Sequence, residues 1–100
     1  MIRHVVMWSF KENAEGKTAQ ENMVFVRDSL YALLPVIPQI KKMDISFDIT
    51  HSDSSSDMML MTEFESIDTL REYVVHPAHQ KVSQYVRKVI DKRMSHDCEI

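Results

Sequence analysis

The sequence predicts an α+β domain in which a four-stranded antiparallel sheet carries its helices on one face, the split-βαβ arrangement. Three observations support this fold class. The chain has 100 residues, so we expect residues 1–100 to form a single domain. Hydrophobic residues alternate in four stretches and recur with helical spacing in the segments between them. Their order is strand, helix, strand, strand, split helix, strand.

The first predicted strand runs from Ile2 to Phe10. Even-numbered residues, which include His4, Val6 and Trp8, lie on one face, and odd-numbered residues lie on the other. Both faces are largely apolar in the middle of this strand. A strand of that kind is expected to be covered on both sides.

A polar connection from Lys11 to Lys17, which holds the only glycine, leads to a predicted helix. The helix begins at about Thr18, because Thr18 followed by Glu21 is the sequence signature of a capping box. Pro35 and Pro38 are expected to end it. Its apolar stripe consists of Met23, Val26, Leu30 and Leu33.

Two strands follow, joined by a polar loop. Residues Ile40 to Thr50 alternate between apolar and polar, so this strand should have one buried and one wetter face. The loop His51 to Asp57 is rich in Ser and Asp and is predicted to be a solvated hairpin connection to the strand Met58 to Phe64.

The last part of the chain predicts a helix that is split at a proline. Ser66 starts a short helix through Val75, and Pro77 suits the first position of a second helix because proline has no backbone N–H to lose. We expect this helix to run through Lys92. A final strand is predicted from Met94 to Ile100.

The helices of this arrangement can cover only one face of the sheet. The first strand is apolar on both faces, so the open face needs another cover. A second copy packing sheet to sheet would supply it. We therefore predict a homodimer whose two sheets enclose an interior.

The composition limits which binding partners and which cellular compartment are expected. The net charge is −3 and the basic residues are scattered, which argues against a nucleic-acid or acidic-membrane surface. No apolar run reaches the roughly 18 residues of a membrane span, and the opening residues lack the cleavage site of a signal peptide. Cys98 is the only cysteine, so no internal disulfide can form and a reducing compartment is expected. We expect a cytoplasmic protein.

The candidate functional residues gather at the proline that splits the helix, in the stretch Tyr73 to His79. His79 would lie in the first turn of the second helix, where the helix dipole disfavours a protonated imidazole. A neutral histidine can accept a proton. His76 would be the cap, and Tyr73 lies one helical turn before it. Capping without any catalytic role is an equally open interpretation of a His-Pro pair at a helix junction.

Several segments resemble one known family. They are the opening I-R-H-V-V-M-W-S-F-K, the connection P-V-I-P-Q-I, the block T-E-F-E-S-I-D-T-L-R-E-Y-V-V-H-P-A-H-Q-K-V and the closing D-C-E-I. Together they resemble the stress-responsive dimeric α/β barrel proteins, or Dabb domains. The resemblance implies a ferredoxin-like protomer and a dimeric α/β barrel. Most members have no assigned activity and are known only as stress-responsive proteins, so the resemblance implies a stress-responsive protein.

One branch of the family consists of plant polyketide cyclases, which close a ring by aldol condensation. The resemblance implies catalytic roles for Tyr73 and His79 and a pocket position for His4. His79 would be the general base, Tyr73 the hydrogen-bond donor and His4 an orienting group. The expected ligand contacts are His76, Val6, Trp8 and Phe10.

Trp8 is expected to narrow the cavity relative to an aliphatic residue. The ligand would be a small apolar or polar-headed molecule in the barrel interior, and no cofactor is expected.

Two further interpretations stay open beside the enzyme. In the first, the protein is a stress protein or ligand carrier in which the histidines are satisfied core groups. In the second, His76 and His79, three residues apart, hold a metal. No H-E-x-x-H pattern or cysteine pair supports zinc, and we expect no metal.

Overall fold

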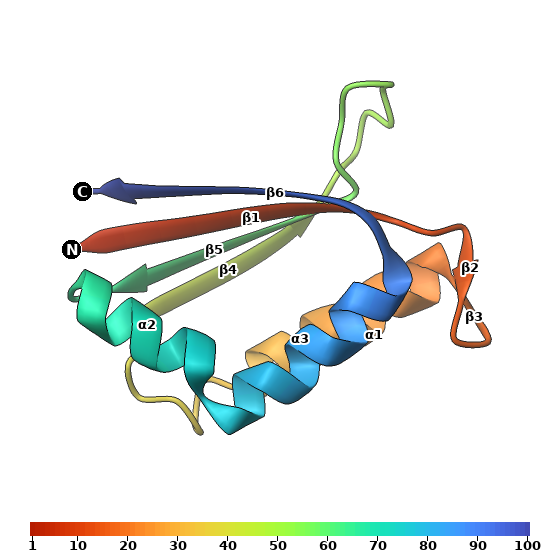
Figure 1. Ribbon diagram of the computed structural model, residues 1–100. Helices are drawn as coiled ribbons and strands as arrows, with labels where there is room; N and C mark the ends of the chain where they lie inside the picture. Colours follow the sequence, from red (N-terminus) through yellow and green to blue (C-terminus); the bar gives the residue numbers. More distant parts are fainter.

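The chain folds into a four-stranded antiparallel sheet with three helices on one face (Figure 1). The computed structural model describes all 100 residues. The sheet order is β4-β5-β1-β6. The strands of this sheet are β1 (Ile2–Phe10), β4 (Lys42–Phe47), β5 (Met58–Phe64) and β6 (Ile90–Glu99). The helices are α1 (Ala19–Tyr31), α2 (Ile67–Val75) and α3 (Pro77–Val89). The predicted α+β fold class is confirmed.

The central strand β1 has the predicted bounds and pairs with β5 on one side and β6 on the other. Its even-numbered residues are buried against the helices, and its odd-numbered residues are only partly covered. His4 lies opposite Thr62 of β5 and Asp97 of β6. The alternation of β1 therefore determines which side chains reach the space between sheet and helices.

Helix α1 begins where the capping box predicts. The Thr18 side chain accepts from the Glu21 N–H, and the Glu21 carboxylate accepts from the Thr18 N–H. The helix ends at Tyr31, before Pro35. Tighter turns follow it, because the residue before a proline is pushed out of the helical conformation. One of these turns is closed by the Leu34 N–H, which donates to the Tyr31 carbonyl at 3.2 Å.

A small hairpin that the sequence analysis missed occupies the polar connection before α1. Its strands are β2 (Asn13–Ala14) and β3 (Lys17–Thr18). Glu15 and Gly16 at its tip have φ angles of 52° and 73°. Glycine suits such a position because it has no Cβ to clash there.

The predicted boundary between the last helix and the last strand was wrong by several residues. Helix α3 ends at Val89 and not at Lys92, and β6 begins at Ile90 and not at Met94. Ile90 and Lys92 pair with the end of β1, with a β-bulge that shifts the register there. Pairing with β1 thus overrides the helical pattern of these residues. Strand β4 is also shorter than predicted, because the predicted strand ran from Ile40 to Thr50.

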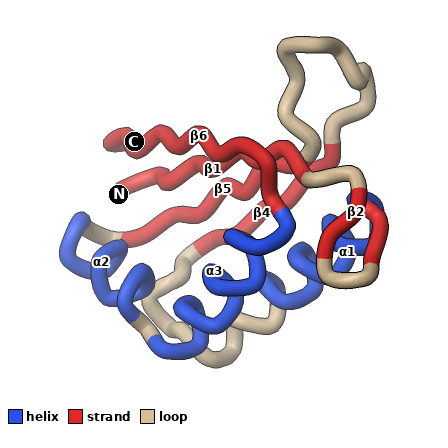
Figure 2. Tube along the Cα trace, turned by 45° about the vertical axis from the view of Figure 1, so that its right-hand side comes forward, coloured by secondary structure: helices blue, strands red, loops and turns tan.

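One face of the sheet is left uncovered by the helices, which all lie on the opposite side (Figures 1 and 2). The loop between β4 and β5 projects on the uncovered side. At the centre of this face are Val5, Met7, Met59, Met61 and Met94, and Met94 is 66% exposed. None of the three helices has the length and apolar character needed to cross a bilayer.

Candidate functional site

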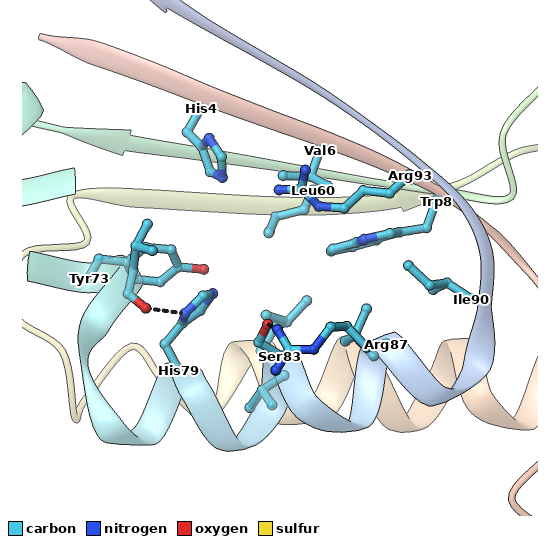
Figure 3. A pocket seen from close by; sticks show the side chains of 14 residues that line it. His4, Val6, Trp8, Leu60, Tyr73, His79, Ser83, Arg87, Ile90 and Arg93 are labelled. Atoms are coloured by element: carbon cyan, nitrogen blue, oxygen red, sulfur yellow. Dashed lines mark hydrogen bonds between the residues drawn. The ribbon is translucent and has the colours of Figure 1, made fainter. Parts of the chain in front are cut away.

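A cavity of about 270 Å³ lies between the helix-covered face of the sheet and the helices α2 and α3 (Figure 3). Fourteen residues of a single chain line it, and nine of them are hydrophobic. We expected the ligand in an interior enclosed by two sheets. The structure instead places the predicted His and Tyr side chains on the other face, because the even-numbered face of β1 is the one that the helices cover.

Helix capping at the α2–α3 junction positions His79. His76 is the N-cap of α3, as predicted, and its Nδ1 accepts from the Ala78 N–H at 3.1 Å. The His79 Nδ1 donates to the Val74 carbonyl oxygen at 3.0 Å. A carbonyl can only accept, so the proton of the neutral ring is on Nδ1 and the lone pair is on Nε2. The ring nitrogen that can take up a proton is therefore the one left free at the cavity.

Burial lowers the pKa of His79 below the ordinary histidine value, and the positively charged groups of Arg93 and Arg87 act in the same direction. The hydrogen bond to Val74 opposes them but does not outweigh them. The expectation of a neutral His79 is supported, although burial and not the helix dipole is the main cause. At neutral pH the imidazole is ready to accept a proton.

Tyr73 lies beside His79, with the two ring centroids 4.3 Å apart. Its side chain is almost fully buried, and its hydroxyl has no hydrogen-bond partner in the protein. Burial raises the pKa of this hydroxyl above the ordinary tyrosine value. The hydroxyl stays protonated, points into the cavity (Figure 3) and can donate to a ligand.

His4 is held by a carboxylate that the sequence analysis did not single out. Its Nδ1 is hydrogen-bonded to Asp97, the residue directly opposite on β6. This bond orients the ring and directs Nε2 toward the cavity (Figure 3). The predicted orienting role of His4 requires a fixed ring, and Asp97 supplies the fixing contact.

Trp8 and Ile90 form the end of the cavity opposite Tyr73 and His79 (Figure 3). The indole N–H of Trp8 is buried without a partner. Binding pockets for small molecules usually measure about 300 to 1,000 Å³. The cavity volume here lies just below that range.

Five of the seven predicted site residues line this one cavity, namely His4, Val6, Trp8, Tyr73 and His79. His76 and Phe10 are not part of the lining. The His76 Nδ1 is used as the cap of α3. Phe10 is buried at the far end of β1, where it pairs with Ile90.

Three polar lining residues were missed by the sequence analysis: Ser83, Arg87 and Arg93. Ser83 and Arg87 lie four and eight residues after His79, so helical spacing alone could have placed them on the same face of α3. Arg93 lies opposite Trp8 in the β1–β6 register. It could not be placed in the cavity while Lys92 was assigned to the helix.

No group of three or more His, Cys, Asp or Glu side chains is arranged so that it could hold a metal ion. Besides Ser83 and the two arginines, the polar groups of the cavity include a neutral base, a protonated hydroxyl and an oriented second histidine, all beside an apolar wall. Such a set can move protons at a carbonyl compound.

Comparison with known proteins places this chain in a family. Residues 2–100 match the profile of the stress-responsive A/B barrel domain, Dabb. The chain belongs to the Dabb family. This Dabb protein is 26% identical over 98 residues to the olivetolic acid cyclase of Cannabis sativa, with 96% of this chain and 93% of the relative covered.

Solved structures share the fold of this Dabb protein. A dimeric protein of unknown function with a ferredoxin-like fold from Bacteroides fragilis superposes with a TM-score of 0.87 at 19% identity, over 99% of this chain and 95% of the other. The hydroxynitrile lyase of Passiflora edulis superposes with a TM-score of 0.85 at 14% identity, over 99% and 92%. The family resemblance and the ferredoxin-like fold that the motifs predicted are confirmed.

Proposed function

We propose that this Dabb protein is a cofactor-independent enzyme of the cyclase or lyase type, acting on a small enolisable carbonyl compound in the cavity of each chain. One observation carries the proposal. The free Nε2 of a neutral His79 and the unpartnered hydroxyl of Tyr73 lie side by side in a largely apolar cavity. A base and a donor aimed at one space are the minimum needed to form an enolate.

The proposed reaction begins with proton transfer from a carbon between two carbonyl groups to the Nε2 of His79. The electron pair moves to the carbonyl oxygen, and the Tyr73 hydroxyl donates a hydrogen bond to the enolate oxygen. The enolate carbon then attacks a second carbonyl of the same molecule and closes a ring, and the protonated His79 returns its proton to the alkoxide. The apolar wall strengthens the hydrogen bond to the enolate oxygen, because electrostatic interactions are stronger in apolar surroundings than in water.

The relatives support this choice among acid–base reactions. The sequence relative is named as a cyclase, and one of the structural relatives is named as a lyase. Both similarities cover more than nine-tenths of this chain. Identity to the cyclase is 26%, so this similarity supports the class of reaction and not a particular substrate.

The test is a screen of linear β-keto thioesters, followed by mass spectrometry for cyclised products. His79→Ala and Tyr73→Phe should each lower turnover of a substrate found in this way by about 100-fold or more. The matched control is His51→Ala, because His51 lies on the exposed β4–β5 loop far from the cavity in sequence. Unchanged turnover in both cavity variants would refute the assignment.

A ligand carrier is the second candidate function. The observation that favours it is the apolar lining, since nine of the fourteen cavity residues are hydrophobic. In a carrier, His79→Ala would mainly lower thermal stability, because the variant loses the hydrogen bond to Val74. A variant as stable as the wild type would count against this candidate.

We also propose that the protein acts as a homodimer that buries the uncovered sheet face. Met7, Met59 and Met94 lie on that face, and soft, unbranched methionine side chains adapt well to a packed interface. The structural relative from Bacteroides fragilis is described as dimeric. Light scattering at micromolar concentration should give twice the mass of the chain, and a stable monomer would refute the proposal.

A further inference from the structure

Two arginines extend toward the cavity from opposite walls, Arg87 from α3 and Arg93 from β6 (Figure 3). Neither has a carboxylate within 4 Å. Arg87 donates from Nη1 to the Ser83 hydroxyl at 3.0 Å, and its other N–H groups are free. The charge of each guanidinium group is therefore not balanced by a carboxylate, and each group has N–H donors without an acceptor.

The rest of the lining does not balance this charge. None of the fourteen lining residues is an Asp or a Glu. Asp97, which is not part of the lining, is hydrogen-bonded to His4. Two further donors, the Trp8 indole N–H and the Tyr73 hydroxyl, are buried without partners at the same cavity. A protein with a net charge of −3 thus has a cavity wall that is cationic and rich in donors.

We infer that the ligand of this cavity carries an anionic group, a carboxylate or a phosphate, which Arg87 and Arg93 hold at the cavity mouth. The guanidinium fork matches the oxygens of either group and can donate to two of them at once. The apolar body of the ligand then lies against Val6, Trp8 and Leu60, with its carbonyl toward Tyr73 and His79. This inference rests on the same cavity as the proposed function, but it requires only binding and not the proposed proton transfer.

Binding can be measured without knowing the natural ligand, because Trp8 is the only tryptophan of the chain and lines the cavity. Its fluorescence should respond to saturation of the site. The probes are hexanoate, hexyl phosphate and hexanamide, which share an alkyl tail and differ in charge. We expect at least one of the two anions to bind about tenfold more tightly than the amide at low ionic strength. The tighter of the two anions identifies the preferred group.

The double variant Arg87→Gln with Arg93→Gln should lose this preference for the anion and bind hexanamide as the wild type does. Both side chains are exposed, so the variant should fold. The control is Lys81→Gln with Lys88→Gln, which removes two positive charges from α3 outside the cavity lining and should keep the preference.

Equal binding of the three probes, no saturable binding of either anion, or an anion preference that survives in the arginine variant would each overturn the inference. His79→Ala separates this result from the proposed chemistry. If that variant keeps the anion preference while the wild type turns over no carbonyl substrate, the anion site stands and the proposed reaction fails. If turnover is found but no anion preference, the reverse holds.

Discussion

Replacing Tyr73 with Phe should make the protein more stable while lowering its proposed activity by about 100-fold or more. The Tyr73 hydroxyl is buried and has no partner in the protein, and an unsatisfied buried hydroxyl costs about 1–3 kcal/mol. Phenylalanine keeps the ring and its contacts, with the Phe64 centroid 5.0 Å away and the His79 centroid 4.3 Å away. We expect a gain of about 1 kcal/mol, which in a domain of this size raises Tm by about 4–8 °C.

The matched control is Tyr85→Phe, because the Tyr85 hydroxyl is fully used. It donates to the Asn22 Oδ1 at 2.6 Å, and Asn22 is completely buried. Removing this donor leaves a buried acceptor unsatisfied, so the variant should lose about 1–3 kcal/mol. Thermal and urea unfolding at one fixed protein concentration would measure both variants. If Tyr73→Phe loses stability as Tyr85→Phe does, the Tyr73 hydroxyl is not free for a ligand and the reasoning fails.

Three further predictions concern the cap, the hairpin and pH. Thr18→Ala removes one half of the α1 capping box and should cost about 1 kcal/mol in urea unfolding; no loss would contradict the capping geometry. Gly16→Ala places a side chain at φ 73° and should cost about 1 kcal/mol by the same assay; an unchanged midpoint would argue against that turn conformation. The pKa of His79 is lowered on folding, so the unfolded chain binds more protons and stability should fall as pH drops below about 6.5. His79→Gln should show a smaller fall, and an identical pH dependence would contradict the assignment.

The fold could be predicted from sequence because its signals are local. The alternation of β1, the Thr18 capping box and the proline at position 77 each act over a few residues, and the structure bears out all three. The cavity could be predicted only in part. His4 and Trp8 share a face of β1, and Tyr73 and His79 share one motif, so local patterns place the members of each pair close together. Only the family resemblance predicted that the two pairs lie in one pocket.

The missed residues depend on long-range pairing. Asp97 meets His4 and Arg93 meets Trp8 only because β6 pairs with β1 in one particular register. The register also changes beyond these pairs, at a β-bulge between Ser9 and Phe10, and no local pattern predicts that bulge. The face of the sheet that the helices cover also depends on long-range packing. The alternation of β1 therefore could not reveal which of its two apolar faces would be covered.

Capping and the proposed catalysis at the α2–α3 junction, which the sequence left as alternatives, are compatible with one arrangement. Pro77 has no N–H to offer the Tyr73 carbonyl, so this carbonyl accepts from the His76 N–H instead and α2 ends. The His76 cap then takes the Ala78 N–H, which would otherwise bond the Val74 carbonyl.

The freed Val74 carbonyl accepts from the His79 Nδ1 and from the Gln80 side chain, each at 3.0 Å. The break in the helix therefore produces the acceptor that fixes the His79 tautomer and leaves Nε2 free at the cavity. A continuous helix through these residues would pair the Val74 carbonyl with the backbone and leave the imidazole without that constraint. The His-Pro pair is thus a structural feature with a chemical consequence, because the tautomer of His79 beside Tyr73 depends on it.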